Sequence, residues 1–306
     1  MSHQVPMAFV SKYSADVKLL IQQRMSRLEA TVSTAPQTAQ FEFHEQIGPV
    51  SAMPWGPRHG DTPLMETPHL RRRVGISPWI WADLIDRPDR LRMLIDPTGP
   101  YATNAVMAFN RRKDDLIIQA ATAAAYTGRQ GEVTVMLPAA QQFVGVGYAD
   151  SPITVELLTD IKTTFWNNDL DEEEVLTMAV SPDSIRSLLL DERVSSADFN
   201  TVRALVRGDV DEFMGFKFVR TTRLPVRPKD PGNLALGFIR SNLVWAKEGI
   251  LLSKGQDITV EVTPRPDKKY ATQVFVSMDL GASRMEEKKV VLFETFEKNA
   301  APRPAP

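Results

Sequence analysis

The sequence predicts a mixed α+β fold, in which two sheet-containing lobes are organised around one long helix. A single stretch, from about Thr103 to Thr127, has the apolar spacing of a long amphipathic helix. Runs that alternate apolar and polar residues, as strands do, occur on both sides of it. The chain has 306 residues, of which 43% are hydrophobic, so it can bury a large core.

The long helix is bounded by the expected start and stop signals. Pro100 precedes it, Thr103 is a candidate cap for its first turn, and Gly128 follows it. One face carries apolar residues at spacings built from three and four: Val106, Phe109, Ile117, Ala120 and Ala124. Lys113 interrupts this stripe, and we expect its stem to lie on apolar surface with its ammonium in water.

The middle of this helix is a belt of charges. Arg111, Arg112, Asp114 and Asp115 follow one another around Lys113. Opposite charges three or four residues apart are neighbours on a helix surface. We therefore expect ion pairs on this belt.

The residues before the helix lack a core of their own. Residues 14–30 have an amphipathic helical pattern, and 31–40 form a polar linker. Residues 41–81 contain two strand-like runs joined by a turn-rich tip, and long excursions of this kind are usually functional or disordered. This excursion carries residue types enriched in interfaces: Trp55, Arg58, Arg71, Arg72 and Arg73. It is expected to lie against a partner, the alternative being a mobile surface loop.

The remaining elements alternate between strands and helices. Residues 78–94 are either helical or extended, and 237–250 are ambiguous between helix and strand. Strands are predicted at 132–137, 175–180, 216–225, 258–263, 273–278 and 290–296, and helices at 152–166, from Pro182 onward, and from Ser196 to Gly208. This order indicates a mixed lobe after the long helix.

Composition excludes several classes of function. The formal net charge is −2, so there is no global electrostatic attraction to nucleic acid or membrane. The 0 cysteines exclude disulfides, thiolate metal sites and cysteine nucleophiles. No apolar run approaches the ~18 residues that span a bilayer, so we expect a soluble protein made in a cytoplasm.

No motif indicates catalysis, a cofactor or a metal. All 4 histidines precede the long helix, where nothing suggests a pocket. The acidic run 169–174 lacks the spacing of a calcium loop and is interpreted as a solvated turn. Gly145 and Gly147 lack the third glycine of a dinucleotide loop. The basic cluster Lys217, Arg220, Arg223, Arg227 and Lys229 fits a strand edge protected against pairing better than it fits nucleic-acid contact.

The order and spacing of several short motifs resemble the major capsid protein of tailed double-stranded DNA bacteriophages, whose shell fold is named after phage Hong Kong ninety-seven. The likeness covers about residues 15–297. The matching stretches are 22–28 (QQRMSRL), 111–115 (RRKDD), 196–200 (SADFN), 208–210 (GDV), 215–218 (GFKF), 223–225 (RLP), 265–269 (RPDKK) and 281–284 (GASR).

This resemblance implies a division of the chain into the parts of a capsid subunit. They are an N-terminal arm (1–40), an extended loop (41–82), a peripheral domain with the spine helix (83–131), an axial domain (132–243), peripheral return strands (244–297) and a flexible tail (298–306). The arm and the loop would reach over neighbouring subunits. Some relatives join subunits by a Lys–Asn bond; residues 41–81 contain no lysine, so we expect no such crosslink.

The resemblance also implies a structural role without cofactor or enzymatic activity. The chain would assemble as hexamers and pentamers into an icosahedral shell enclosing double-stranded DNA, held by weak non-specific contact. Portal, scaffolding and cement proteins would be further partners, with no membrane involved. The protein would lie in the host cytoplasm before assembly and in the virion capsid afterwards.

Three groups of residues are the candidates for subunit contacts. Trp55, Arg58, Arg71, Arg72 and Arg73 would dock the extended loop on a neighbour. Arg111, Arg112, Asp114 and Asp115 would form salt bridges within or between subunits, and Met25 and Leu28 would anchor the arm. Two alternatives remain open: an encapsulin that encloses a protein cargo, and a soluble α/β enzyme.

Overall fold

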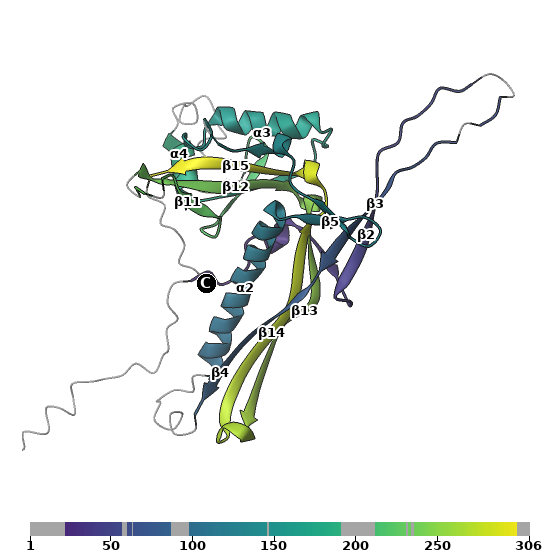
Figure 1. Cartoon of the computed structure of the whole chain (residues 1–306). Helices are drawn as coiled ribbons and strands as arrows, with labels where there is room; N and C mark the ends of the chain where they lie inside the picture. Colours follow the sequence, from purple (N-terminus) through teal and green to yellow (C-terminus); the bar gives the residue numbers. More distant parts are fainter. Residues whose placement is uncertain are drawn as a thin grey trace, which may run out of the picture. The chain divides into compact units, whose positions relative to one another are not determined.

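The structure, a computed structural model, describes residues 22–56, 60–62, 64–86, 98–145, 147–190, 212–230, 232–233 and 236–298 (Figure 1). The chain divides into two compact units. The first takes its described residues from the ranges 1–26, 78–112 and 256–279, and the second takes them from 27–77, 113–255 and 280–306.

A seven-stranded sheet is the centre of the second unit. Its strand order is β7 (Gln142–Phe143), β15 (Val290–Glu297), β12 (Phe238–Ala246), β8 (Leu176–Val180), β10 (Phe216–Arg220) and β9 (Glu212–Phe213), with β11 (Val226–Pro228) also paired to β12. β12 runs antiparallel to β15 and β8, whereas β8 and β10 are parallel. The segment between β8 and β10 contains α4 (Pro182–Leu190), because parallel neighbours need a crossover connection.

Both faces of this sheet are covered, which explains why every residue of β8 is buried. One face packs against α3 (Val155–Asn167), which lies within the helix predicted at 152–166. Its buried residues form one apolar stripe: Leu157, Leu158, Ile161 and Phe165. The other face packs Trp245 and Leu243 against Ile117, Ala121 and Leu28. Alternate residues of one strand therefore enter two separate cores.

A second sheet in the same unit has the order β2 (Phe41–Ile47), β3 (His69–Gly75), β5 (Ala125–Thr127) and β6 (Val133–Val135), all antiparallel. The Gly48 amide donates to the Pro68 carbonyl at 2.9 Å. This bond closes the base of the segment 48–68 that joins β2 to β3. The predicted strands of the excursion are thus confirmed.

The third sheet has the order β1 (Ser33–Pro36), β13 (Ile250–Arg265), β14 (Ala271–Arg284) and β4 (Ser77–Ile85). β13 and β14 are longer than the predicted strands and are joined by the short turn η6 (Pro266–Lys268). The remaining 3₁₀ turns among the described residues are η2 (Glu29–Thr31), η3 (Ala139–Gln141), η5 (Lys247–Gly249) and η7 (Glu287–Lys289).

The long helix is present, but its predicted ends were wrong. α2 spans Thr98–Thr122. Thr103 is not a cap, because its hydroxyl donates to the Gly99 carbonyl at 3.0 Å inside the helix. Pro100 lies within the first turn, where its missing N–H has no helical partner to lose. The helix ends early because 125–127 pair as a strand with β3 and β6.

The predicted arm helix is also wrong over its described part. Residues 22–28 are not helical. The amides of Arg27 and Leu28 donate to the carboxylate of Asp114 instead of to a preceding turn. The ambiguous stretch 237–250 contains β12, and 78–85 are extended. The helix predicted from Ser196 lies outside the described residues.

Lys289 joins two turns of the second unit and gives a pH-dependent contribution to stability. Its ammonium lies 2.9 Å from Glu248 and 3.3 Å from Glu174. Burial opposes the charge most strongly, but the hydrogen bonds to Glu248 and Glu174 raise the pKa of Lys289 overall. The hydrogen bond and charge of Lys289 lower the pKa of Glu248.

We expect this contribution to be present at neutral pH and to fade toward both extremes. A lowered carboxyl pKa stabilises the fold above the ordinary glutamate value of 4.5, and that gain is lost as pH falls. A raised lysine pKa stabilises the fold below the ordinary value of 10.5, and that gain is lost as pH rises. Urea unfolding of Lys289→Met from pH 3 to pH 7 should show a flatter rise in stability than the unmodified chain; parallel curves would contradict this.

Candidate assembly surfaces

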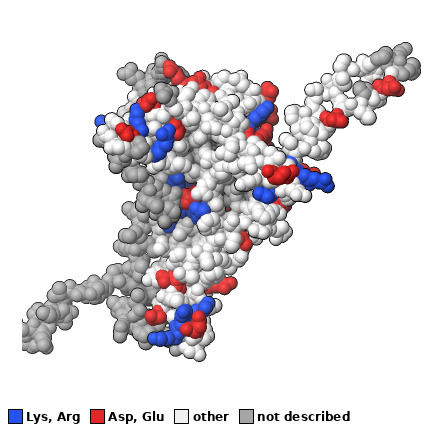
Figure 2. Space-filling view, viewed as in Figure 1, with Lys and Arg blue, Asp and Glu red and all other residues white. Residues whose placement is uncertain are grey.

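The segment between β2 and β3 presents apolar side chains to solvent. We call this the loop surface: Val50, Met53, Trp55, Leu64 and Met65. Trp55 is 96% exposed and Leu64 98%. In Figure 2 the projecting segment is mostly uncharged. A run of exposed apolar residues is typical of an interaction site. Arg58, predicted to belong here, lies outside the described residues.

The three arginines at the base of this segment have different surroundings. Arg72 is 5% exposed, and its guanidinium donates to the Met285 carbonyl at 3.1 Å and to Glu287 at 3.0 Å. Arg73 stacks over the rings of Phe41 and Tyr126. Arg71 pairs with Glu45 at 2.7 Å, and both side chains are exposed. Arg72 and Arg73 therefore stabilise the second sheet, and Arg71 is the most accessible of the three.

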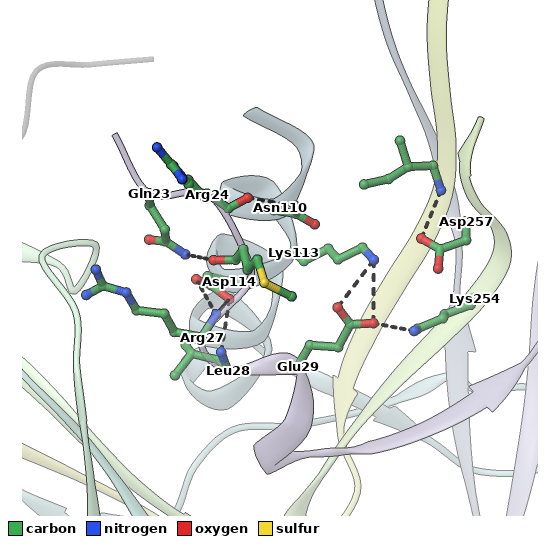
Figure 3. Close-up of polar contacts among 12 residues, drawn as sticks. Gln23, Arg24, Arg27, Leu28, Glu29, Asn110, Lys113, Asp114, Lys254 and Asp257 are labelled. Carbon is green, nitrogen blue, oxygen red and sulfur yellow. Dashed lines mark hydrogen bonds and ion pairs between the residues drawn. The ribbon is translucent and has the colours of Figure 1, made fainter. Parts of the chain in front are cut away.

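In the first unit, the arm residues 22–24 follow α2. The side chain of Gln22 donates to Asn104 at 2.9 Å and accepts from Arg111 at 2.7 Å. Asn110 donates to the Arg24 carbonyl at 3.0 Å, a contact visible in Figure 3. Met25 is 76% exposed. The polar side chains of the helix thus hold the backbone of the arm, and Met25 stays available to a partner.

In the second unit, Asp114 holds the next part of the arm (Figure 3). Its carboxylate accepts from the amides of Arg27 at 3.1 Å and Leu28 at 3.1 Å. Leu28 is fully buried in the core. A carboxylate that receives two amides fixes the chain direction at the point where Leu28 enters the core.

Lys113 is not placed as predicted. It is 3% exposed, and its ammonium lies 3.3 Å from the carboxylate of Glu29 instead of in water. Lys254 of β13 contacts the same carboxylate (Figure 3). The prediction failed because the helix pattern alone does not show that the arm packs here and brings Glu29 close to Lys113.

The other two members of the charge belt have separate partners. The guanidinium of Arg223 meets Asp115 through two hydrogen bonds, with Nε to Oδ1 at 2.6 Å, and both side chains are mostly buried. Arg112, within the first unit, stacks 3.9 Å above the ring of Trp79. Asp115 therefore has an ion pair within the subunit, whereas salt bridges of the belt between subunits stay a prediction. Arg223 belonged to the basic cluster, and its pairing was not predicted.

Replacing Asp114 with alanine should lower the free energy of unfolding by about 1–3 kcal/mol, because two amides at the arm lose their acceptor. Asp114→Asn keeps one acceptor oxygen and should cost less. Chemical denaturation monitored by tryptophan fluorescence measures both. Equal stability of the alanine variant and the unmodified chain would show that the arm contacts are marginal.

The part of the chain that the structure describes has neither a cluster of metal ligands nor a membrane-spanning helix. No group of three or more histidine and carboxylate side chains is placed to hold a metal ion there. Among the described helices, none combines the length and apolar character required to cross a bilayer.

Comparison with known proteins identifies the family. The sequence profile of the phage capsid protein family matches residues 5–297. No curated protein matches the chain significantly. Similar solved structures include the capsid of Ralstonia phage GP4 (TM-score 0.72, 11% identity, covering 96% of this chain and 97% of that chain). Another is the capsid of cyanophage P-SCSP1u (TM-score 0.68, 17% identity, 95% and 94% covered).

The head of Helicobacter pylori bacteriophage KHP40 has the same fold at 7% identity, with a TM-score of 0.72 and 94% and 96% of the two chains covered. At such identities the likeness establishes the fold, and the profile establishes the family. The predicted fold class is confirmed. The chain belongs to the phage capsid protein family, has the Hong Kong ninety-seven-type shell fold, and is a structural major capsid protein.

Proposed function

We propose that this chain assembles as hexamers and pentamers into an icosahedral shell that encloses double-stranded phage DNA. The loop surface carries this proposal. Side chains such as Trp55 and Leu64 are almost fully exposed in the single chain, and a neighbouring subunit would bury them. Obligate interfaces often exceed 2,000 Å² and are more apolar than transient ones.

The division into working parts follows the resemblance. The arm (1–40) and the extended loop (41–82) reach neighbours, residues 132–243 form the axial domain, and 83–131 with 244–297 form the peripheral domain; 298–306 are a tail. Portal, scaffolding and cement proteins are the further partners, and the subunit resides in the host cytoplasm before assembly. DNA contact is weak and non-specific, in keeping with the net charge of −2.

Electron microscopy and sedimentation of the expressed chain, alone and with its scaffolding partner, test the proposal. Closed shells or capsomer rings are expected. A compact monomer under both conditions would contradict it. Nuclease-protected nucleic acid inside particles from infected cells would separate a DNA-filled shell from an encapsulin with a protein cargo.

A further inference from the structure

An open hollow in the second unit is lined by cations. It has a volume of about 560 Å³ and is bordered by Arg27, Lys217 and Arg220, together with Pro182, Phe218 and Val219. None of these lining residues is acidic. The side chain of Arg27 donates to the Arg220 carbonyl at 2.6 Å, which fixes one wall. We call this the basic hollow.

The charges of the basic hollow are not neutralised within the described residues. All three cationic side chains are exposed, and none of them forms an ion pair with another described residue. Glu212 lies opposite Lys217 across the β9–β10 pair without forming one. Among the described residues, the basic hollow therefore offers positive charge that is free to meet an acidic partner.

A cluster of opposite charge lies elsewhere in the same unit. Asp169, Asp171, Glu172 and Glu173 are exposed between α3 and β8. Asp169 has a left-handed backbone (φ 56°), which turns the chain out of the helix. We call these four residues the acidic turn.

The acidic turn and the basic hollow adjoin the same two strands. The acidic turn leads into Leu176, the first residue of β8. The basic hollow extends along β10, where Lys217 pairs with Thr177 and Arg220 pairs with Val180, the last residue of β8. Because β8 is fully buried and hydrogen-bonded on both sides, the two charged regions are held in a fixed position relative to each other.

Two separate patches of opposite charge, held by one buried strand, suit a contact in which one patch of each subunit meets the other patch of its neighbour. Such a heterologous contact repeats around a ring when the rotation closes. We propose that the acidic turn of one subunit docks in the basic hollow of the next copy within a capsomer. This inference rests on the proposed function, because it assigns one contact of the proposed ring.

A second copy fits the hollow better than nucleic acid does. The same chain carries the complementary acidic cluster, and a shell surface that faced DNA would gain nothing from four exposed carboxylates nearby. Complementary charges also steer encounter and fix register between subunits. The contact is exposed, so salt should weaken it.

The double variant K217E/R220E tests the contact, with Lys247→Glu as a matched control on an exposed lysine of the same unit. K217E/R220E should raise the concentration needed for ring or shell formation at least tenfold at low salt, and the control should not. The melting temperature of the dissociated subunit should be unchanged for both, since the substituted side chains are exposed. Sedimentation velocity provides the readout.

A mixture of two variants with exchanged charges tests the docking contact more directly. K217E/R220E makes the hollow acidic, because two new carboxylates outnumber the remaining Arg27. D171K/E172K/E173K makes the turn basic, because three new lysines outnumber the remaining Asp169. Each variant therefore has two patches of the same sign and should assemble poorly alone. Together they should alternate around a ring, which only an even number of subunits can close. Hexamers should therefore return in the mixture, without pentamers.

The outcomes separate the two proposals. If the unmodified chain forms no rings with or without scaffold, the proposed function fails. If it forms rings and K217E/R220E forms them equally well, only the docking contact is wrong. If K217E/R220E forms normal shells that hold less nucleic acid, the hollow binds DNA and the inference is overturned.

Discussion

Replacing Arg284 with methionine should lower the free energy of unfolding by about 3–5 kcal/mol, a larger loss than the one expected for Asp114→Ala. Arg284 is fully buried at the end of β14. Its guanidinium donates to the carbonyls of Ala121 at 2.8 Å, Ala123 at 2.9 Å and Val135 at 3.0 Å. It thereby satisfies the carboxyl end of α2, whose last carbonyls have no helical partner.

The substitution would leave these carbonyls without their donor and would remove one of the two arginines that face Glu287. Glu287 lies 3.6 Å from Arg284 and also pairs with Arg72. Burial is the main influence that lowers the pKa of Arg284, yet an arginine keeps its charge in a protein. The charge is therefore buried permanently and depends on these partners.

Chemical denaturation of Arg284→Met measures the effect, with Arg265→Met as the control. Arg265 pairs with Asp267 at 3.0 Å, but both side chains are about half exposed and solvent screens the pair, so its loss should cost much less than the loss of Arg284. Similar losses in the two variants would show that the buried network contributes no more than a surface pair.

Replacing Trp55 with alanine should abolish shell assembly at concentrations that suffice for the unmodified chain. Central aromatic residues of an interface often contribute about 2 kcal/mol or more, which raises the required concentration about thirtyfold for each contact that limits assembly. The subunit itself should be unaffected, because Trp55 is 96% exposed and packs on little of its own chain.

Light scattering during assembly and melting of the dissociated subunit measure the two effects separately. Trp55→Phe keeps a large apolar ring and should restore most of the assembly. Normal assembly of Trp55→Ala would remove the loop surface from the interface. A lowered melting temperature would instead place Trp55 in the fold of the subunit.

The sequence pattern correctly predicted the elements whose structure depends mainly on residues close by in the chain. The stripe of α3 gives its four buried residues because one face meets one core. The helix predicted from Pro182 onward is α4, and the Ser181 hydroxyl accepts the Ser184 amide at 3.0 Å at its start. The C-terminal end of α2 could not be predicted from the local sequence pattern. Residues 125–127 continue the helical stripe, but pairing with β3 and β6 makes them a strand.

The candidate site was predicted in part for the same reason. The charge belt suggested pairs within the helix. It did not suggest the partners from segments far along the chain, such as Arg223 for Asp115 and Glu29 for Lys113. The spacing of residues within the helix does not reveal pairs with residues of distant segments. The docking of Trp55 on a neighbour stays a prediction. Its exposure in the single chain follows from the turn-rich segment around it, which has no core to bury a large ring.

The position of β15 has a consequence for biosynthesis. This strand is inserted between β7 and β12, and its last residue, Glu297, accepts hydrogen bonds from Arg240 at 2.8 Å and from Ser184 at 3.2 Å. The central sheet therefore cannot close until residue 297 has left the ribosome. A chain interrupted earlier would expose the open edge of β12. Chains that end before β15 should therefore fail to complete the central sheet.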